Sequence, residues 1–122
     1  MSGTAIKNAS NAGIGIHYPH YDTLNYNLSN NCFRHCKLGI TALSYLSWIS
    51  ITNSSFIQNE CGIAANAPMK IDNNLFSGNS QALSMDSRSV ITNNEFSDNE
   101  TMNPGSGNFI ISVRYEVDFT NN

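Results

Sequence analysis

The chain has 122 residues, enough for one hydrophobic core but not for two. Only 12% of the residues are charged, the net charge is −3, and three Lys and three Arg are scattered along the sequence, so a basic face for nucleic acid is not expected. Nineteen asparagines make the chain polar, but 40% hydrophobic residues and the regular spacing of Ile and Phe argue against disorder.

No targeting or membrane-spanning segment is expected. A basic and then apolar leader is absent after Met1, and the longest fairly apolar stretch, residues 39–51, is too short to span a membrane. Cys32, Cys36 and Cys61 leave at least one thiol unpaired within the chain, which is not the pattern of a disulfide framework.

One motif recurs along the chain with a period near twenty residues. The stretch "AIKNASNAGIGI" (5–16) fits the end of a first copy, and "VDFTNN" (117–122) fits the start of a last one. Between them lie "SNNCFRHCKLGI" (29–40), "TNSSFIQNECGI" (52–63), "DNNLFSGNSQAL" (72–83) and "TNNEFSDNE" (92–100). Phenylalanine occupies one column with spacings of 23, 20 and 20 residues: Phe33, Phe56, Phe76 and Phe96.

Two further columns accompany the phenylalanines. Three residues before each Phe stands an asparagine: Asn30, Asn53, Asn73 and Asn93, with Asn121 in the same column of the last copy. Six residues after the first three stand Gly39, Gly62 and Ala82, each followed by Ile or Leu. Glycine before that aliphatic column suits a turn or a close approach of two backbone segments.

Each copy is predicted to be a coil of three short strands. Apolar residues alternate in runs rich in β-branched side chains, as in "WISITNS", "MKIDNN" and "SVITNN", which indicates strands. Helical arrays show Ala, Leu, Glu and Lys at a spacing of 3.6 residues, and the leucine-rich pattern is absent. Each strand would then lie about 4.8 Å from its equivalent in the next coil, with phenylalanines filling the interior and a buried asparagine column forming a hydrogen-bonded ladder.

The pattern N-x-x-F-x-x-N-x-x-G-I resembles that of the right-handed parallel β-helix repeat proteins of the pectate-lyase-like superfamily. This resemblance covers nearly the whole chain. It implies an all-β fold, a right-handed parallel β-helix of about five coils with an Asn ladder and an internal Phe stack. We expect residues 1–122 to form a single β-helix domain that is part of a longer solenoid. The family includes polysaccharide lyases, hydrolases, epimerases, tailspikes, adhesins and non-catalytic surface modules, so the resemblance does not specify a function.

The period is broken by insertions, which in repeat proteins often carry the function. From the aliphatic column to the asparagine column the shortest coils use ten residues, whereas the second coil uses thirteen and the first uses sixteen. The extra residues lie around "HYPHYDT" and "LSYLSW", at the same corner of neighbouring coils. This corner gathers a predicted ligand-binding group: Tyr18, His20, Tyr21, Tyr45 and Trp48. Such aromatics suit stacking on sugar faces; the alternative is that they cap the apolar end of the helix.

A catalytic role is the less favoured alternative. "GIHYPHYDTLN" resembles the D-P-H-[DE] motif of the mannuronan C5-epimerases at Pro19 and His20, while its acidic positions are occupied by Tyr18 and Tyr21. If the chain is an enzyme, His17, His20 and Asp22 are the candidates for moving a proton. No Arg or Lys column stands beside them to hold a uronate carboxylate.

No metal or cofactor is predicted. The aspartates that could bind calcium fall in different columns: Asp72, Asp86, Asp98 and Asp118. Cys32, His35 and Cys36 have a spacing that matches no common zinc motif, and ordinary thiols are favoured there. A disulfide between Cys36 and Cys61 on adjacent coils is left open.

We therefore expect a non-catalytic β-helix module of a surface or secreted, extracellular protein, which recognises a glycan or a protein. The alternatives are a polysaccharide-modifying enzyme, either a uronate epimerase or a lyase, and a purely structural spacer. Because the chain begins and ends within a coil, end-to-end self-association or continuation in a longer chain is expected. No nucleic-acid partner is expected.

Overall fold

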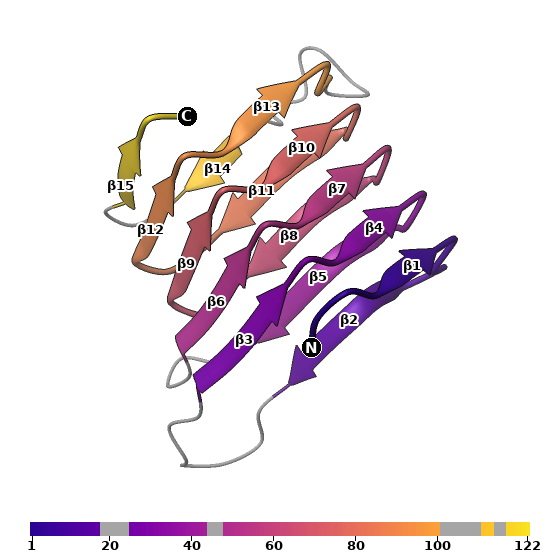
Figure 1. Ribbon diagram of the computed structural model, residues 1–122, viewed down its shortest axis with the longest axis horizontal. Coiled ribbons are helices and arrows are strands. Elements are labelled where there is room, and N and C mark those ends of the chain that lie inside the picture. The colour runs from indigo at the N-terminus through magenta and orange to yellow at the C-terminus, as the bar shows by residue number, and fades with distance from the viewer. Residues whose placement is uncertain (18–24, 44–47, 101–110, 114–116) are drawn as a thin grey trace.

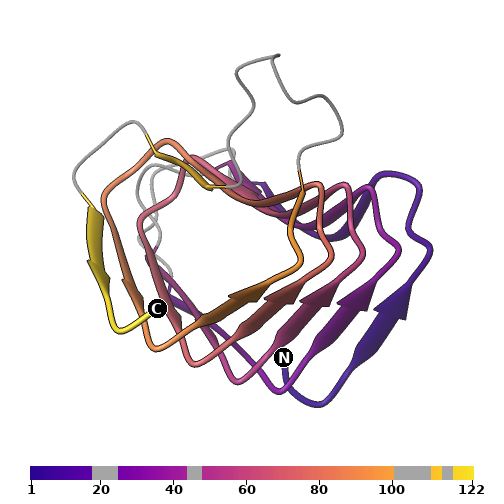
Figure 2. The same ribbon diagram turned by 90° about the horizontal axis from the view of Figure 1, so that it is seen from above.

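The chain winds into a parallel β-solenoid. The computed structural model describes residues 1–17, 25–43, 48–100, 111–113 and 117–122. In this part of the chain fifteen strands and no helix are present, and successive coils stack with their strands parallel (Figure 1). Figure 2 shows the coils one behind another, each with three sides joined at corners.

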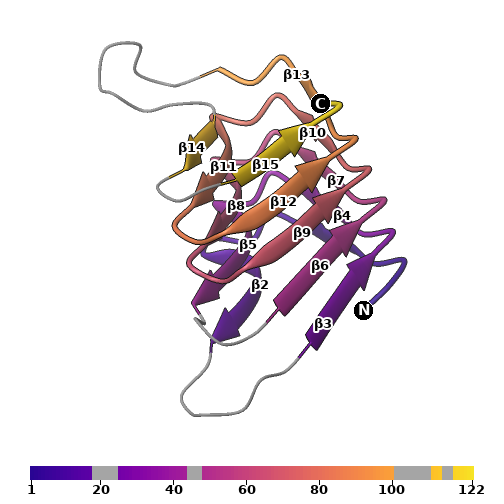
Figure 3. The same ribbon diagram turned by 90° about the vertical axis from the view of Figure 1, so that its left-hand side faces the viewer.

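The strands form three parallel sheets of five strands each. The first sheet contains β1 (Ala5–Lys7), β4 (Cys32–Arg34), β7 (Ser55–Ile57), β10 (Leu75–Ser77) and β13 (Glu95–Ser97). The second contains β2 (Ala12–His17), β5 (Leu38–Leu43), β8 (Cys61–Ala65), β11 (Gln81–Met85) and β14 (Ile111–Val113). The third contains β3 (Asn25–Ser29), β6 (Trp48–Thr52), β9 (Met69–Asp72), β12 (Ser89–Thr92) and β15 (Val117–Thr120), and it faces the viewer in Figure 3.

Each strand pairs with the same segment of the next repeat, which confirms the predicted β-helix. Phe33 is in register with Phe56, and Phe56 with Phe76. The five predicted coils correspond to the five layers of these sheets, which amount to about four full turns from the first layer to the last. Within a strand, side chains alternate between the interior of the coil and its outer face. In β6, for example, Ile49 and Ile51 are buried while Trp48 points outward.

The predicted phenylalanine stack is confirmed at the centre of the coil. Ring centroids are 5.0 Å apart between Phe33 and Phe56, 4.8 Å between Phe56 and Phe76, and 5.0 Å between Phe76 and Phe96, with interplanar angles below 10°. The first three rings are fully buried. Aliphatic residues of the other two sheets complete the core: Ile40, Ile63, Leu83, Ile49, Ile51, Ile71 and Ile91.

A buried asparagine ladder is present, but it does not lie at the column that was predicted to be buried. Asn30, Asn53, Asn73 and Asn93 are exposed, and all four have φ between 50° and 57°. Asparagine tolerates this left-handed conformation better than most residues, so the column marks the corner between the third and first sheets. The buried ladder lies one residue later, at Asn31, Ser54, Asn74 and Asn94, and the exposed Asn122 continues it.

A second ladder follows the first sheet. The side-chain oxygen of Asn79 accepts a hydrogen bond from the backbone N–H of Asn59 (3.0 Å), and that of Asn99 accepts one from Asn79 (3.0 Å). The Asn79 amide also donates to the Phe56 carbonyl oxygen at 2.8 Å. Within the described residues no buried side-chain nitrogen or oxygen is left without a partner. The ladders therefore satisfy backbone groups at corners where the sheets stop.

The glycine column allows the close approach expected of it. A Cβ atom added at Gly39 would lie 2.9 Å from a ring carbon of Phe56, and it would also meet the backbone oxygen of Gly62. At Gly62 the added atom would lie 2.6 Å from the oxygen of Ala82. Neither glycine is among the residues with positive φ, so packing rather than backbone conformation requires glycine here.

Candidate functional site

The predicted aromatic corner is only partly described. Tyr18, His20, Tyr21, Asp22 and Tyr45 lie outside the described residues, so their roles stay predictions. His17 and Trp48, which flank these segments, are described. They lie at the corner between the second and third sheets, at the end of β2 and the start of β6.

Trp48 presents its indole to solvent. Its side chain is 41% exposed, whereas Ile49 beside it is fully buried. Asn25, its register partner in the preceding coil, is exposed too. On the other side the Ile49 N–H donates to the Pro68 carbonyl oxygen at 3.1 Å, which holds β6 against the next coil. The ring is thus an exposed apolar surface on a rigid strand.

His17 is the exposed last residue of β2 and is in register with Leu43. Its ring lies over its own strand, because a Cβ atom added at Gly15 would be 3.0 Å from His17 Nε2. The absence of a side chain at Gly15 therefore provides the space that the imidazole occupies. Leu43 is itself 48% exposed, so this corner carries apolar as well as polar surface.

A hollow of about 250 Å³ lies on the second-sheet side of the same corner. Its floor includes Thr41, Ala64 and Ser84, which are in register on β5, β8 and β11 and point outward. Asn66 and Asp86, the first residues after β8 and β11, line one side, and Leu43 contributes apolar surface. Hydroxyl, amide and carboxylate groups beside exposed apolar surface are suited to holding a hydroxylated ligand. Sequence analysis missed this hollow, because its residues come from three coils and share no motif.

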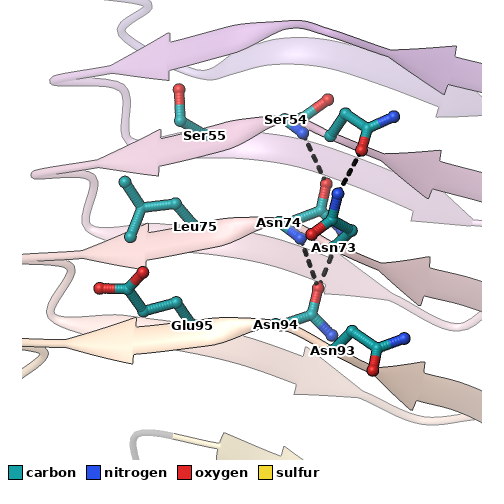
Figure 4. Close-up of a pocket in the computed structure, with 9 residues that line it drawn as sticks. Ser54, Ser55, Asn73, Asn74, Leu75, Asn93, Asn94 and Glu95 are labelled. Carbon is teal, nitrogen blue, oxygen red and sulfur yellow. Dashed lines mark hydrogen bonds between the residues drawn. The ribbon is translucent and has the colours of Figure 1, made fainter. Parts of the chain in front are cut away.

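A second hollow, of about 430 Å³, lies at the corner between the third and first sheets. Figure 4 shows its asparagines aligned along the stack. Asn73 Nδ2 donates to Asn53 Oδ1 at 2.5 Å, and Asn74 Nδ2 donates to Asn94 Oδ1 at 3.0 Å. Most of these amides hydrogen-bond to neighbouring coils, so the described contacts give this hollow a structural role.

At the same corner, the carboxylate of Asp72 is held by neighbouring side chains. Asn93 Nδ2 and Thr92 Oγ1 donate to Asp72 Oδ1 at 2.9 and 2.8 Å, and Lys70 Nζ lies 3.8 Å from Oδ2. The hydrogen bond from Asn93, followed by that from Thr92, lowers the pKa of Asp72 from its ordinary value of 3.8. The Asp72 side chain is half-buried, and these hydrogen bonds stabilise its ionised form.

The three cysteines are free thiols. Cys36 and Cys61 are buried, and the disulfide that their adjacent coils left open is not formed. Burial raises the pKa of Cys61 to about 12, so this thiol is protonated at neutral pH. Cys36 occupies the second-ladder position, where its N–H donates to Asn59 Oδ1 at 2.9 Å. No group of three or more His, Cys, Asp or Glu among the described residues is arranged to hold a metal ion.

Comparisons with protein-family models, curated proteins and solved structures gave no match. The structure alone therefore shows the parallel β-solenoid, and membership of the pectate-lyase-like superfamily stays a prediction. No helix in the described part of the chain has the length and hydrophobicity needed to cross a membrane.

Proposed function

We propose that this chain is a non-catalytic recognition module of a surface or secreted protein, which binds a glycan at the corner between the second and third sheets. The observation that carries the proposal is the exposed indole of Trp48 at the same corner as the hollow formed by Thr41, Leu43 and Ser84. A sugar ring has apolar faces edged by hydroxyl groups. An exposed aromatic ring at the same corner as hydroxyl and amide groups offers surfaces complementary to both.

The rigidity of the corner supports recognition. β6 and β9 are held in parallel register from Ile49 and Met69 onward, so Trp48 is positioned by a packed sheet. A site that is already ordered loses little conformational entropy when it binds a ligand. The predicted tyrosines of the two insertions would extend the same surface.

Trp48 is the only tryptophan in the chain, so its fluorescence reports directly on this corner. A glycan array identifies a ligand, and titration of that oligosaccharide should then shift the emission. Trp48→Ala should weaken binding at least about tenfold, as expected for a central aromatic contact, and the double variant with Tyr21→Ala should lose it. For these variants, binding is measured by calorimetry.

Thr52→Ala is the matched control, since it alters the outer face of the same strand away from the corner. It should bind like the unmodified chain. Equal weakening by Thr52→Ala and Trp48→Ala would contradict a site at the corner, and a folded chain that binds no glycan would favour a scaffold. Turnover of a uronate polymer, abolished by His20→Ala, would instead support the epimerase or lyase alternative.

A further inference from the structure

The outer face of the first sheet changes charge along the stack. Lys7 on β1 and Arg34 on β4 are in register and exposed at one end. Glu95 on β13 and Asp98 just after it are exposed at the other end. Among the described residues the ion pair present is that of Lys70 with Asp72, so these four charges form none with another described residue.

The middle of this face is uncharged. β7 and β10 present Ser55, Ile57, Leu75 and Ser77, all half-buried and in register. The face therefore has a positive end, a centre of hydroxyl and apolar groups, and a negative end. All five of its strands lie within the described residues.

We propose that this face binds the same face of a second copy of the chain, with the coil order of the two copies reversed. The two-fold axis lies in the plane of contact, runs parallel to the strands and passes over β7, the central strand. As a result, β1 of one copy faces β13 of the other. A two-fold contact requires a surface that is complementary to itself, and a surface running from positive to negative meets that requirement. With the coil order unreversed, β1 would face β1 and β13 would face β13, so that Lys7 would lie near its own counterpart and Glu95 near its own.

The register of the sheet specifies which side chains meet. Lys7 of one copy faces Ser97 of the other, beside Glu95 and Asp98. Cys32 faces Leu75, since they occupy one outward column on the two strands that flank β7. Ile57 lies at the axis and contacts its own counterpart, which covers a half-buried apolar group on each chain.

The strands of this face span about 24 Å along the stack and about 10 Å across it, at 4.8 Å per strand and 3.3 Å per residue. That area is well below the roughly 800 Å² per partner typical of a stable complex. The dimer is therefore weak unless the flanking corners contribute, and it weakens further in salt because its charges are exposed. The proposal is independent of glycan binding, which uses a different corner.

Disulfide trapping tests the arrangement. Cys32 and residue 75 of one chain are two strands apart, about 10 Å, which is too far for a disulfide within the chain. Under mild oxidation by diamide, Leu75→Cys should therefore give a covalent dimer through Cys32. Val90→Cys, which adds a thiol to the outer face of the third sheet, is the matched control and should give only background. Adding Cys32→Ser to Leu75→Cys should abolish the dimer.

Charge reversal tests the electrostatic part in solution. By sedimentation velocity at high protein concentration, Lys7→Glu should weaken dimerisation at least tenfold, and Lys7→Glu with Glu95→Lys should restore it to within about threefold of the original. Arg88→Glu makes the same change in net charge outside this face and should have little effect. Circular dichroism checks that each variant is folded.

Two results would overturn the proposal. One is a Leu75→Cys disulfide yield no higher than that of Val90→Cys. The other is association that continues beyond a dimer as concentration rises, which would show end-to-end stacking of coils instead.

Discussion

Two adjacent asparagines in each repeat have different structural roles. Asn73 is exposed at the corner with φ of 57°, whereas Asn74 is buried and hydrogen-bonds to two other coils. The left-handed corner residue turns the chain, and the next side chain then points into the coil. A column of identical residues in a sequence can therefore reflect backbone conformation rather than a buried contact.

Replacing these two asparagines should have very different effects on stability. Asn74→Ala leaves the Ser54 N–H and the Ile51 carbonyl without their partners and should reduce the free energy of unfolding by about 2–3 kcal/mol. Asn73→Gly keeps a residue that tolerates positive φ, so its cost should stay within about 0.5 kcal/mol. Urea unfolding measures both, and similar losses would contradict these separate roles.

Asp72 should make the stability of the fold depend on pH in the acidic range. Its pKa is lowered in the folded state, so its contribution is present above the ordinary pKa of 3.8 and is lost as pH falls below that value. Asp72→Asn should therefore flatten the decrease in melting temperature below pH 4. Carboxyl NMR titration measures the shift directly, and a pKa at or above 3.8 would be the contrary result.

At the scale of the element, the strands are short and depend on stacking. The strands of the first sheet have three residues each, too few to be stable alone. Each contributes one central side chain to the interior, and the Phe stack joins four of them at about 5 Å spacing. Each strand is therefore stabilised mainly by packing against its neighbours along the stack.

Removing a ring from the middle of the stack should be far more costly than removing one at its edge. Phe76 is fully buried between two rings, so Phe76→Ala should cost about 3–5 kcal/mol. Phe119 is 45% exposed and 6.0 Å from Phe96, with the rings inclined by 29°, and Phe119→Ala should cost much less. Chemical denaturation compares them, and equal costs would show that the stack is not the source of stability.

For the molecule as a whole, contacts are made between neighbouring coils. β7 lies between β4 and β10, while β1 has a strand on one side only among the described residues. In such one-dimensional arrays stability depends on intrinsic terms and nearest-neighbour terms, so central coils should open least often.

Hydrogen exchange should show this gradient. Amides of β4, β7 and β10, and of β5 and β8, should exchange most slowly, and those of β1 and β3 should exchange earlier. Mass spectrometry of peptides along the chain measures it. Uniform protection would indicate a single all-or-none transition, and strongest protection at β1 would contradict the nearest-neighbour account.

The sequence could predict less about the site than about the fold. The repeat predicts that the two insertions fall at one corner of neighbouring coils, but the exposure of Trp48 depends on which side of β6 is packed. The hollow that contains Thr41, Ala64 and Ser84 combines unlike residues from three coils, so no pattern along the chain marks it. The tyrosines predicted for this corner lie outside the described residues.

By itself, the sequence determined the parallel β-helix, its period and its phenylalanine stack. Like residues repeated every twenty positions or so can bury their rings and satisfy their amides by lying above one another. Only the tertiary structure decided which asparagine of each pair is buried, because the corner conformation sets the direction of the next side chain. It also showed that Lys7 and Arg34 are exposed side by side at one end of the first sheet, while Glu95 is exposed at the other end, although neighbours along the stack are a full coil apart in the sequence.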